Sequence, residues 1–264
     1  MKRYIAMAAL LLGAVACQKE SNIAQYDPSQ IYVEASVKNT RVSGTSFEAG
    51  DRMSLYVVEY TGEDVAKLQV AGNYINNEPM LYDGVQWKGE RPLFWSKTHC
   101  DFYGVYPYQE PQTVTNYLFD IVTDQNSPEV AGQLSGYEAS DLMWAKAEKH
   151  SREDGAVKLQ FQHMMSKLVV DIVRGPSYEG ELPENIVTHI YNTATTAKVN
   201  YQTGSLEKYS LSENKTITMR KIDNRTFDAI IVPQFIERST PLVEITMGGI
   251  AYLLNYSMSF RPGY

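Results

Sequence analysis

The sequence predicts an all-β protein built as a sandwich or a barrel. This class is indicated by short stretches in which apolar and polar residues alternate, by turn-forming Asn, Asp, Gly and Pro between them, and by an excess of tyrosine. The chain has 264 residues, with 19 Tyr against 8 Phe and 3 Trp, and tyrosine favours strands. Many short strands separated by turn signals are typical of sandwiches and barrels rather than of a parallel α/β sheet.

The first half of the chain begins with a strand pattern at residues 31–37. Apolar residues recur there at every second position, which predicts a strand with one buried face. The same reasoning predicts strands at 53–58, 80–87, 100–106 and 117–122. Residues 140–149 form the one plausible helix of this half, with a strand and a loop as the alternative. The charged stretch 148–155 is the candidate domain boundary.

The second half repeats the alternation, with one change of parity. Apolar residues fall on odd positions in 157–163 and on even positions in 168–172. Because a slip of one residue turns every side chain to the other face, a bulge or break is required near 164–167, with a short helix as the alternative. Residues 174–185 read as a loop. Further strands are predicted at 186–191, 196–202, 215–220 and 226–232, and the clearest hairpin joins 242–247 to 250–256 across Gly248-Gly249.

The N-terminus carries the pattern of an export signal. A basic start is followed by the apolar run 5–16 and then by Cys17, which predicts a signal peptide over residues 1–16. The apolar run is too short to span a bilayer, which takes about 20 residues. A cysteine directly after small residues resembles the lipobox of bacterial lipoproteins, so we expect Cys17 to be acylated, with residues 17–30 as a polar tether from the outer membrane. The alternative is an ordinary signal peptide with an incidental cysteine.

The composition and the motifs exclude several functions. A net charge of −7 argues against nucleic acid as a partner. No serine-nucleophile elbow, zinc-binding helix motif or phosphate loop is present, so we expect no enzyme activity and no cofactor. The histidines are scattered and predict no metal site: His99, His150, His163 and His189. A calcium loop at Asp120, Asp124 and Asn126 is the weaker alternative to a solvated turn, because the spacing lacks the required Gly and Glu.

A few other side chains invite a functional and a structural interpretation. Trp87, Trp95 and Trp144 could stack on sugar rings, although core positions are the commoner use of such aromatics. Cys100 is expected to be a small buried hydrophobe, and it has no partner for a disulfide if Cys17 is acylated. Asp51 is expected to bind nearby backbone amides in a turn. We expect His163 to be structural, in a β interior or at the interface between domains.

Several phrases then occur in a fixed order. They are Thr40-Arg41, FEAGDRM at 47–53, Trp87 followed by PLFW at 92–95, FYGVYP at 102–107, Asp124-Gln125, DLM at 141–143, FQHMMSKL at 161–168, VPQ at 232–234 and FRPGY at 260–264. In order and spacing they resemble the fimbrillin-like family of surface lipoproteins, over essentially the whole mature chain.

The resemblance implies two tandem transthyretin-like β-sandwich domains, which we place at 31–155 and 156–264. It implies a subunit, anchor or tip component of a fimbrium that acts in adhesion and joins other pilus subunits by β-strand exchange. In that family an arginine-specific protease removes an N-terminal strand. Arg41 is the candidate processing site here, and 31–37 would be the strand lost; the alternative is that Arg41 is a loop residue and the strand stays, as anchor subunits allow.

The family pattern commonly continues beyond the FRPGY phrase into further strands. Here the sequence stops at Tyr264, so either the reading frame is truncated or the second domain lacks its last strand. A host protein or a glycan remains open as an additional partner. Two rival functions also stay open: a glycan-binding surface lipoprotein of a nutrient-uptake system, which needs a row of exposed aromatics, and a secreted hydrolase, which needs a polar cleft.

Overall fold

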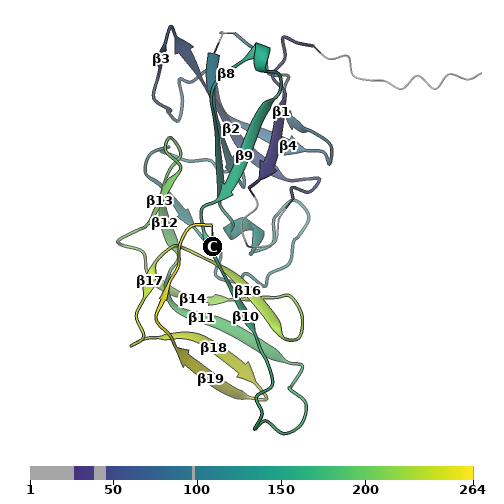
Figure 1. The fold of residues 1–264 in the computed structure, drawn as a ribbon, viewed down its shortest axis with the longest axis vertical. Helices are drawn as coiled ribbons and strands as arrows, with labels where there is room; N and C mark the ends of the chain where they lie inside the picture. The colour runs from purple at the N-terminus through teal and green to yellow at the C-terminus, as the bar shows by residue number, and fades with distance from the viewer. Residues whose placement is uncertain (1–26, 39–45, 97–98, 264) are drawn as a thin grey trace, which may run out of the picture.

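The computed structural model describes residues 27–38, 46–96 and 99–263, and its regular secondary structure consists of β-strands apart from two 3₁₀ turns. The all-β prediction is confirmed, whereas the finer assignment to transthyretin-like domains stays a prediction. The molecule is elongated, with the first half of the chain at one end and the second half at the other (Figure 1). Cys17, Arg41 and Tyr264 lie outside the described residues.

Eight strands form the N-terminal sheet, in the order β3-β2-β4-β5-β1-β9-β8-β6. Because β2 also pairs with β6, the sheet closes on itself. Its strands are β1 (Val33–Val37), β2 (Arg52–Thr61), β3 (Asp64–Val65), β4 (Ile75–Tyr82), β5 (Trp87–Gly89), β6 (His99–Tyr106), β8 (Met143–Ser151) and β9 (Val157–His163). Two single-turn 3₁₀ helices, η1 (Glu138–Ser140) and η2 (Arg152–Asp154), flank β8.

The second half of the chain forms smaller sheets. One has the order β14-β11-β18-β19, a second β10-β16-β15, a third β13-β12-β7 and the last pairs β17 with β20. The strands are β7 (Tyr117–Asp120), β10 (Ser166–Asp171), β11 (Ile186–Ala194), β12 (Thr196–Asn200), β13 (Ser205–Lys208), β14 (Asn214–Thr218), β15 (Arg220–Lys221), β16 (Thr226–Ile231), β17 (Phe235–Ile236), β18 (Pro241–Met247), β19 (Ile250–Asn255) and β20 (Met258–Ser259).

The change of sheet does not coincide with the expected division at residue 155. β9 pairs with β1 and β8 of the first half, so the break falls between β9 and β10. That break is the interruption predicted at 164–167 from the change of parity. In the other direction, β7 pairs with β12 of the second half. Strand β9 of the second half thus belongs to the N-terminal sheet, and β7 of the first half belongs to a sheet of the C-terminal half.

Most predicted strands are confirmed, and two local predictions are corrected. Of the residues 140–149 expected to form a helix, 143–149 lie in the strand β8, which was the alternative left open, and their buried residues Met143 and Ala145 fall at every second position. The predicted strand at 80–87 is divided, since β4 ends at Tyr82 and β5 starts at Trp87. Asp83 causes the turn between them: its carboxylate accepts hydrogen bonds from two backbone amides, those of residues 85 and 86, at 2.9 and 2.8 Å.

The predicted hairpin around the glycine pair is confirmed in detail. Met247 and Ile250 are partners, so Gly248 and Gly249 alone form the loop. Both have positive φ, at 58° and 77°. A two-residue type I′ turn requires this conformation, and glycine adopts it without strain.

The strands β2 and β6, whose pairing closes the N-terminal sheet, are buried on both faces. On β2, Met53 and Leu55 pack inside the closed sheet, while Tyr56 and Val58 belong to a second core that continues into the C-terminal half. On β6, Phe102 packs inside the closed sheet and Tyr103 belongs to the second core. The side chains of β2 and β6 that point away from the interior of the closed sheet thus join the two halves through one shared core.

A Gly104→Ala substitution tests the packing inside the closed sheet. A Cβ at this position would lie 2.6 Å from Phe161 Cζ and 3.0 Å from Leu159 Cδ1. We expect the overpacked variant to lose roughly 1–3 kcal/mol of unfolding free energy in urea titrations. Gly175→Ala is the matched control, because nothing lies within 4 Å of its added methyl group; equal losses in both variants would contradict the packing argument.

Candidate functional site

The first candidate site is the place that β1 occupies between β5 and β9, here called the β1 site. β1 runs parallel to β9, in register from Val33 opposite Val157 to Val37 opposite Phe161. Its contact with β5 is a single pair, Val33 with Trp87. β1 therefore covers the edge of β9 and completes the closed sheet.

Alternate side chains of β1, and Ile31 just before it, point into an apolar interior. Ile31 and Val33 are 4% and 5% exposed, and Val157, Leu159 and Phe161 of β9 are fully buried beneath the strand. The alternate residue Glu34 faces solvent. The strand is thus held by backbone pairing along β9 and by apolar side chains at every second position, which is how one strand recognises the edge of a sheet.

Phe47 closes one end of the β1 site. Its ring makes edge contacts with Trp87, Tyr106 and Phe161 at centroid distances of 5.0, 5.4 and 5.4 Å. Phe47 comes from the loop that leads into β2, whose turn is fixed by Asp51. As predicted, the Asp51 carboxylate accepts a backbone amide hydrogen bond, from Glu48 at 2.7 Å, and it also accepts one from the Tyr106 hydroxyl at 2.7 Å.

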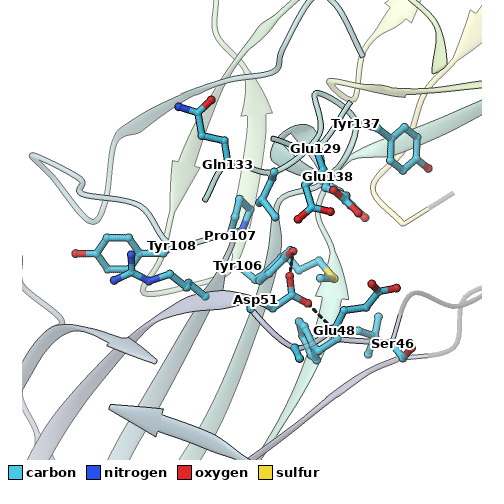
Figure 2. Close-up of a pocket in the computed structure, with 18 of the residues that line it drawn as sticks. Ser46, Glu48, Asp51, Tyr106, Pro107, Tyr108, Glu129, Gln133, Tyr137 and Glu138 are labelled. Atoms are coloured by element: carbon cyan, nitrogen blue, oxygen red, sulfur yellow. Dashed lines mark hydrogen bonds between the residues drawn. The ribbon is translucent and has the colours of Figure 1, made fainter. Parts of the chain in front are cut away.

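A cavity of about 560 Å³ lies beyond this aromatic cluster. Figure 2 shows Glu48 and Asp51 on one side of it, facing Glu129 and Glu138 on the other. Val37 and Ser46, the residues on either side of the stretch that carries Arg41, both line the cavity. The walls are more acidic than basic, and no ligand-specific arrangement of side chains is evident among the described residues.

A buried ionic cluster stands at the border between this cavity and the C-terminal half. Asp228 is fully buried on β16 and accepts two hydrogen bonds from Arg220, both 2.8 Å long. Lys167 lies 3.1 Å from the same carboxylate. The Arg220 guanidinium also sits 3.4 Å from the centroid of the Tyr137 ring. A buried carboxylate needs such partners, and here they tie β10, β15 and β16 to the segment before η1.

His163 lies near this cluster, at the end of β9. Its Nδ1 is 2.8 Å from Asp141 Oδ1, and both side chains are largely buried. Burial by itself lowers the pKa of His163, but the hydrogen bond and the charge of Asp141 outweigh it and raise the pKa above its ordinary value. The structural role expected for His163, at the junction of the two halves, fits this geometry.

The tryptophans form no exposed row. Trp87 is buried, Trp95 stacks on His150 at 6.1 Å, and the Trp144 indole donates a 2.7 Å hydrogen bond to the Tyr201 carbonyl. In the closed sheet β5 and β8, which carry Trp87 and Trp144, are separated by β1 and β9. The tryptophans therefore offer no flat platform for a sugar chain.

The remaining candidate residues lie apart from one another. Cys100 is fully buried, and burial raises the pKa of its thiol to about 12. His189 contacts Glu244 at 3.2 Å, far along the chain from the other histidines. Asp124 accepts a hydrogen bond from the Asn126 amide at 3.2 Å, which is the turn that was predicted as the alternative to a calcium loop. Among the described residues, no group of three His, Cys, Asp or Glu is placed to hold a metal ion.

Sequence reasoning missed the ionic cluster and the cavity. Asp228 interrupts the apolar run of β16 at a position flanked by Phe227 and Ala229, and a carboxylate inside such a run is a signal for a buried ion pair. Its partners Arg220 and Lys167 carry no comparable signal in the sequence, since only the pairing of β10 and β15 with β16 brings them together.

A model of the family described as fimbrillin-like matches residues 40–264. The chain belongs to the fimbrillin-like family. This confirms the resemblance carried by the ordered phrases, and β1 lies before the matched region. No curated protein sequence matches the chain.

Solved structures share the fold of this fimbrillin-like protein. A candidate cell adhesion protein from Bacteroides uniformis is 20% identical, with a TM-score of 0.63 over 88% of this chain and 86% of that one. A second from Bacteroides ovatus is 15% identical, with a TM-score of 0.64 over 90% and 89%. A fimbrial protein from Bacteroides ovatus is 16% identical, with a TM-score of 0.55 over 89% of this chain and 47% of that one. At these identities the likeness establishes the fold, and family membership fits a role at the cell surface in fimbriae or adhesion.

Within the described residues, no helix has the length and apolar character needed to cross a bilayer.

The pair of His163 and Asp141 gives the junction a pH dependence. Because the pKa of His163 is raised above about 6.5 in the folded chain, the pair contributes stability that is fully present below about pH 6.5 and is lost as the pH rises through the folded pKa. We expect Asp141→Asn to lower the pKa of His163, measured by NMR titration of its ring protons. Asp120→Asn, a carboxylate bonded to Thr196 rather than to a histidine, is the control; an unchanged titration in Asp141→Asn would contradict this assignment.

Proposed function

We propose that this fimbrillin-like protein is a surface-exposed pilus component in adhesion, held at the outer membrane by lipid on Cys17 and joined to other subunits by β-strand exchange at the β1 site. The observation that carries the proposal is the placement of β1. It is an N-terminal strand inserted between β5 and β9, and its removal would cut no other strand.

The β1 site has the properties of a strand receptor. Removal of β1 would leave unpaired backbone groups along β9, above an apolar floor formed by Leu159 and Phe161. An open sheet edge with apolar pockets binds an extended segment from another chain, through main-chain hydrogen bonds and alternate side chains. The incoming strand would need apolar residues at every second position, matching Val33, Ala35 and Val37.

Cleavage at Arg41 would release β1 together with the tether. Arg41 follows the end of β1 by four residues, and Val37 and Ser46 on either side of it both border the cavity. The division into an N-terminal domain around the closed sheet and a C-terminal domain beyond it is part of the same proposal. Strand exchange between subunits would take place in the N-terminal domain and would leave the C-terminal domain unchanged.

Proteolysis of the full chain tests strand exchange. We expect an arginine-specific protease to cut after Arg41 and the product to form oligomer ladders that resist SDS, as followed by mass spectrometry and unboiled gels. Arg41→Ala is the matched control and should stay intact and unpolymerised. A cleanly cut chain that remains monomeric would exclude a polymerising subunit and leave the roles of anchor or tip.

A peptide competition distinguishes exchange at the β1 site from general aggregation. A synthetic peptide with the sequence of residues 31–38 should refill the site and slow the ladders. The same peptide with Val33→Asp should not, because its carboxylate would enter the apolar interior. Equal inhibition by both peptides would count against the β1 site.

Lipid attachment has its own test. Expressed with its signal peptide, the full chain should incorporate radiolabelled palmitate and partition into the membrane fraction. We expect Cys17→Ser to lose both the label and the membrane association, whereas Cys100→Ser, a change at the buried thiol, keeps the label. Equal labelling of the wild-type chain and Cys17→Ser would rule out Cys17 as the acylated residue.

A further inference from the structure

Among the described residues, the C-terminal half has a second sheet edge that is open without any cleavage. β19 is the last strand of its sheet, and among the described residues nothing pairs with its outer side. It follows the two-residue turn after β18, with Met247 opposite Ile250. This strand lies at the extremity of the C-terminal half in Figure 1, far from the β1 site.

The register of the hairpin decides which backbone groups face outward. In a two-residue hairpin the closing pair, Met247 and Ile250, exchanges both hydrogen bonds, and hydrogen-bonded and non-bonded pairs then alternate. The amide and carbonyl groups of Ile250 and Tyr252 therefore point toward β18. Those of Ala251, Leu253 and Asn255 point away from it and are available to another strand.

The side chains of β19 are apolar and exposed on both faces of the sheet. Ile250, Tyr252 and Leu254 are 57%, 42% and 48% exposed. They lie opposite Met247, Ile245 and Val243 of β18, residues that are packed against or part of the core. The three side chains continue this core-facing surface beyond the edge of the core, where about half of each remains open to solvent.

This edge lacks the usual protection against pairing. No charged residue occurs from 245 to 260, although the chain as a whole carries a net charge of −7. The opposite edge strand of the same sheet, β14, includes the exposed Lys215, and the edge strand β10 includes the exposed Asp171. Charged residues on edge strands are the common device that prevents edge-to-edge association, and β19 has none.

We propose that β19 pairs with β19 of a second copy of this chain, antiparallel and about a two-fold axis at Tyr252. A second copy is the occupant that the charges favour, because two acidic molecules repel one another least where both surfaces are neutral. The axis at Tyr252 places Ala251 opposite Leu253 of the second copy, so the outward backbone groups bond to one another. It also places Ile250 opposite Leu254, which continues the apolar row across the interface.

Sedimentation velocity on the full chain carrying Arg41→Ala tests this pairing while β1 remains in place. We expect a monomer–dimer equilibrium that Tyr252→Lys and Leu254→Lys each weaken at least tenfold. Val85→Lys, at a residue 86% exposed on the turn between β4 and β5, is the control and should leave the dimer unchanged. Circular dichroism and melting curves establish that the variants are folded. A monomer at all concentrations, or a dimer that survives both lysine substitutions, would overturn the proposal.

A cysteine at the symmetry axis tests the register. In the full chain with Cys17→Ser, the Tyr252→Cys variant should form an intermolecular disulfide on mild oxidation, because directly opposed non-bonded pairs have Cα atoms about 4.5 Å apart. Val85→Cys is the matched control and should not cross-link. Cys100 is buried and should not react. Equal cross-linking of both variants would refute the two-fold register.

Discussion

The N-terminal sheet depends on β1 to cover the edge of β9. Val157, Leu159 and Phe161 are completely buried, and β1 pairs along their strand with apolar residues at the matching positions. β5 cannot replace it, since β5 has three residues and meets β1 at one pair. The strand that completes the sheet is thus also the first strand of the described residues, held by contacts that another extended segment of the same pattern could make.

Loss of β1 would not dissolve the rest of the molecule. β2 and β6 pair over six residue pairs and are buried on both faces, so they belong to the closed sheet and to the core shared with the second half. The pairing of β7 with β12 and the Asp228 cluster hold the halves together independently of β1. The remaining strands can therefore keep the β1 site in shape after β1 is removed, because the shared core, the β7–β12 pairing and the Asp228 cluster also hold them.

The alternation of apolar residues predicted most strands, the break at 164–167 and the glycine hairpin, because these follow from local periodicity and turn chemistry. It left β8 open between a helix and a strand, and only the pairing of β8 with β6 and β9 decides for the strand. The parallel pairing of β1 with β9 joins residues far apart in the sequence, so no local pattern could reveal it. The same holds for the cluster around Asp228, whose members come from three strands and a loop.

The β1 site and the edge at β19 differ in the symmetry of the contact that each can make. This difference determines the kind of assembly that each can build. In the proposed strand exchange, a strand inserted at the β1 site would join unlike surfaces, so each added subunit would keep a free end and the assembly would grow without limit. Pairing of β19 with its own copy joins like surfaces and stops at two. The edges lie on opposite halves of the elongated molecule, so occupation of one leaves the other free. Growth along a fibre and association between fibres would then rest on different strands, the first gated by cleavage at Arg41 and the second limited only by concentration.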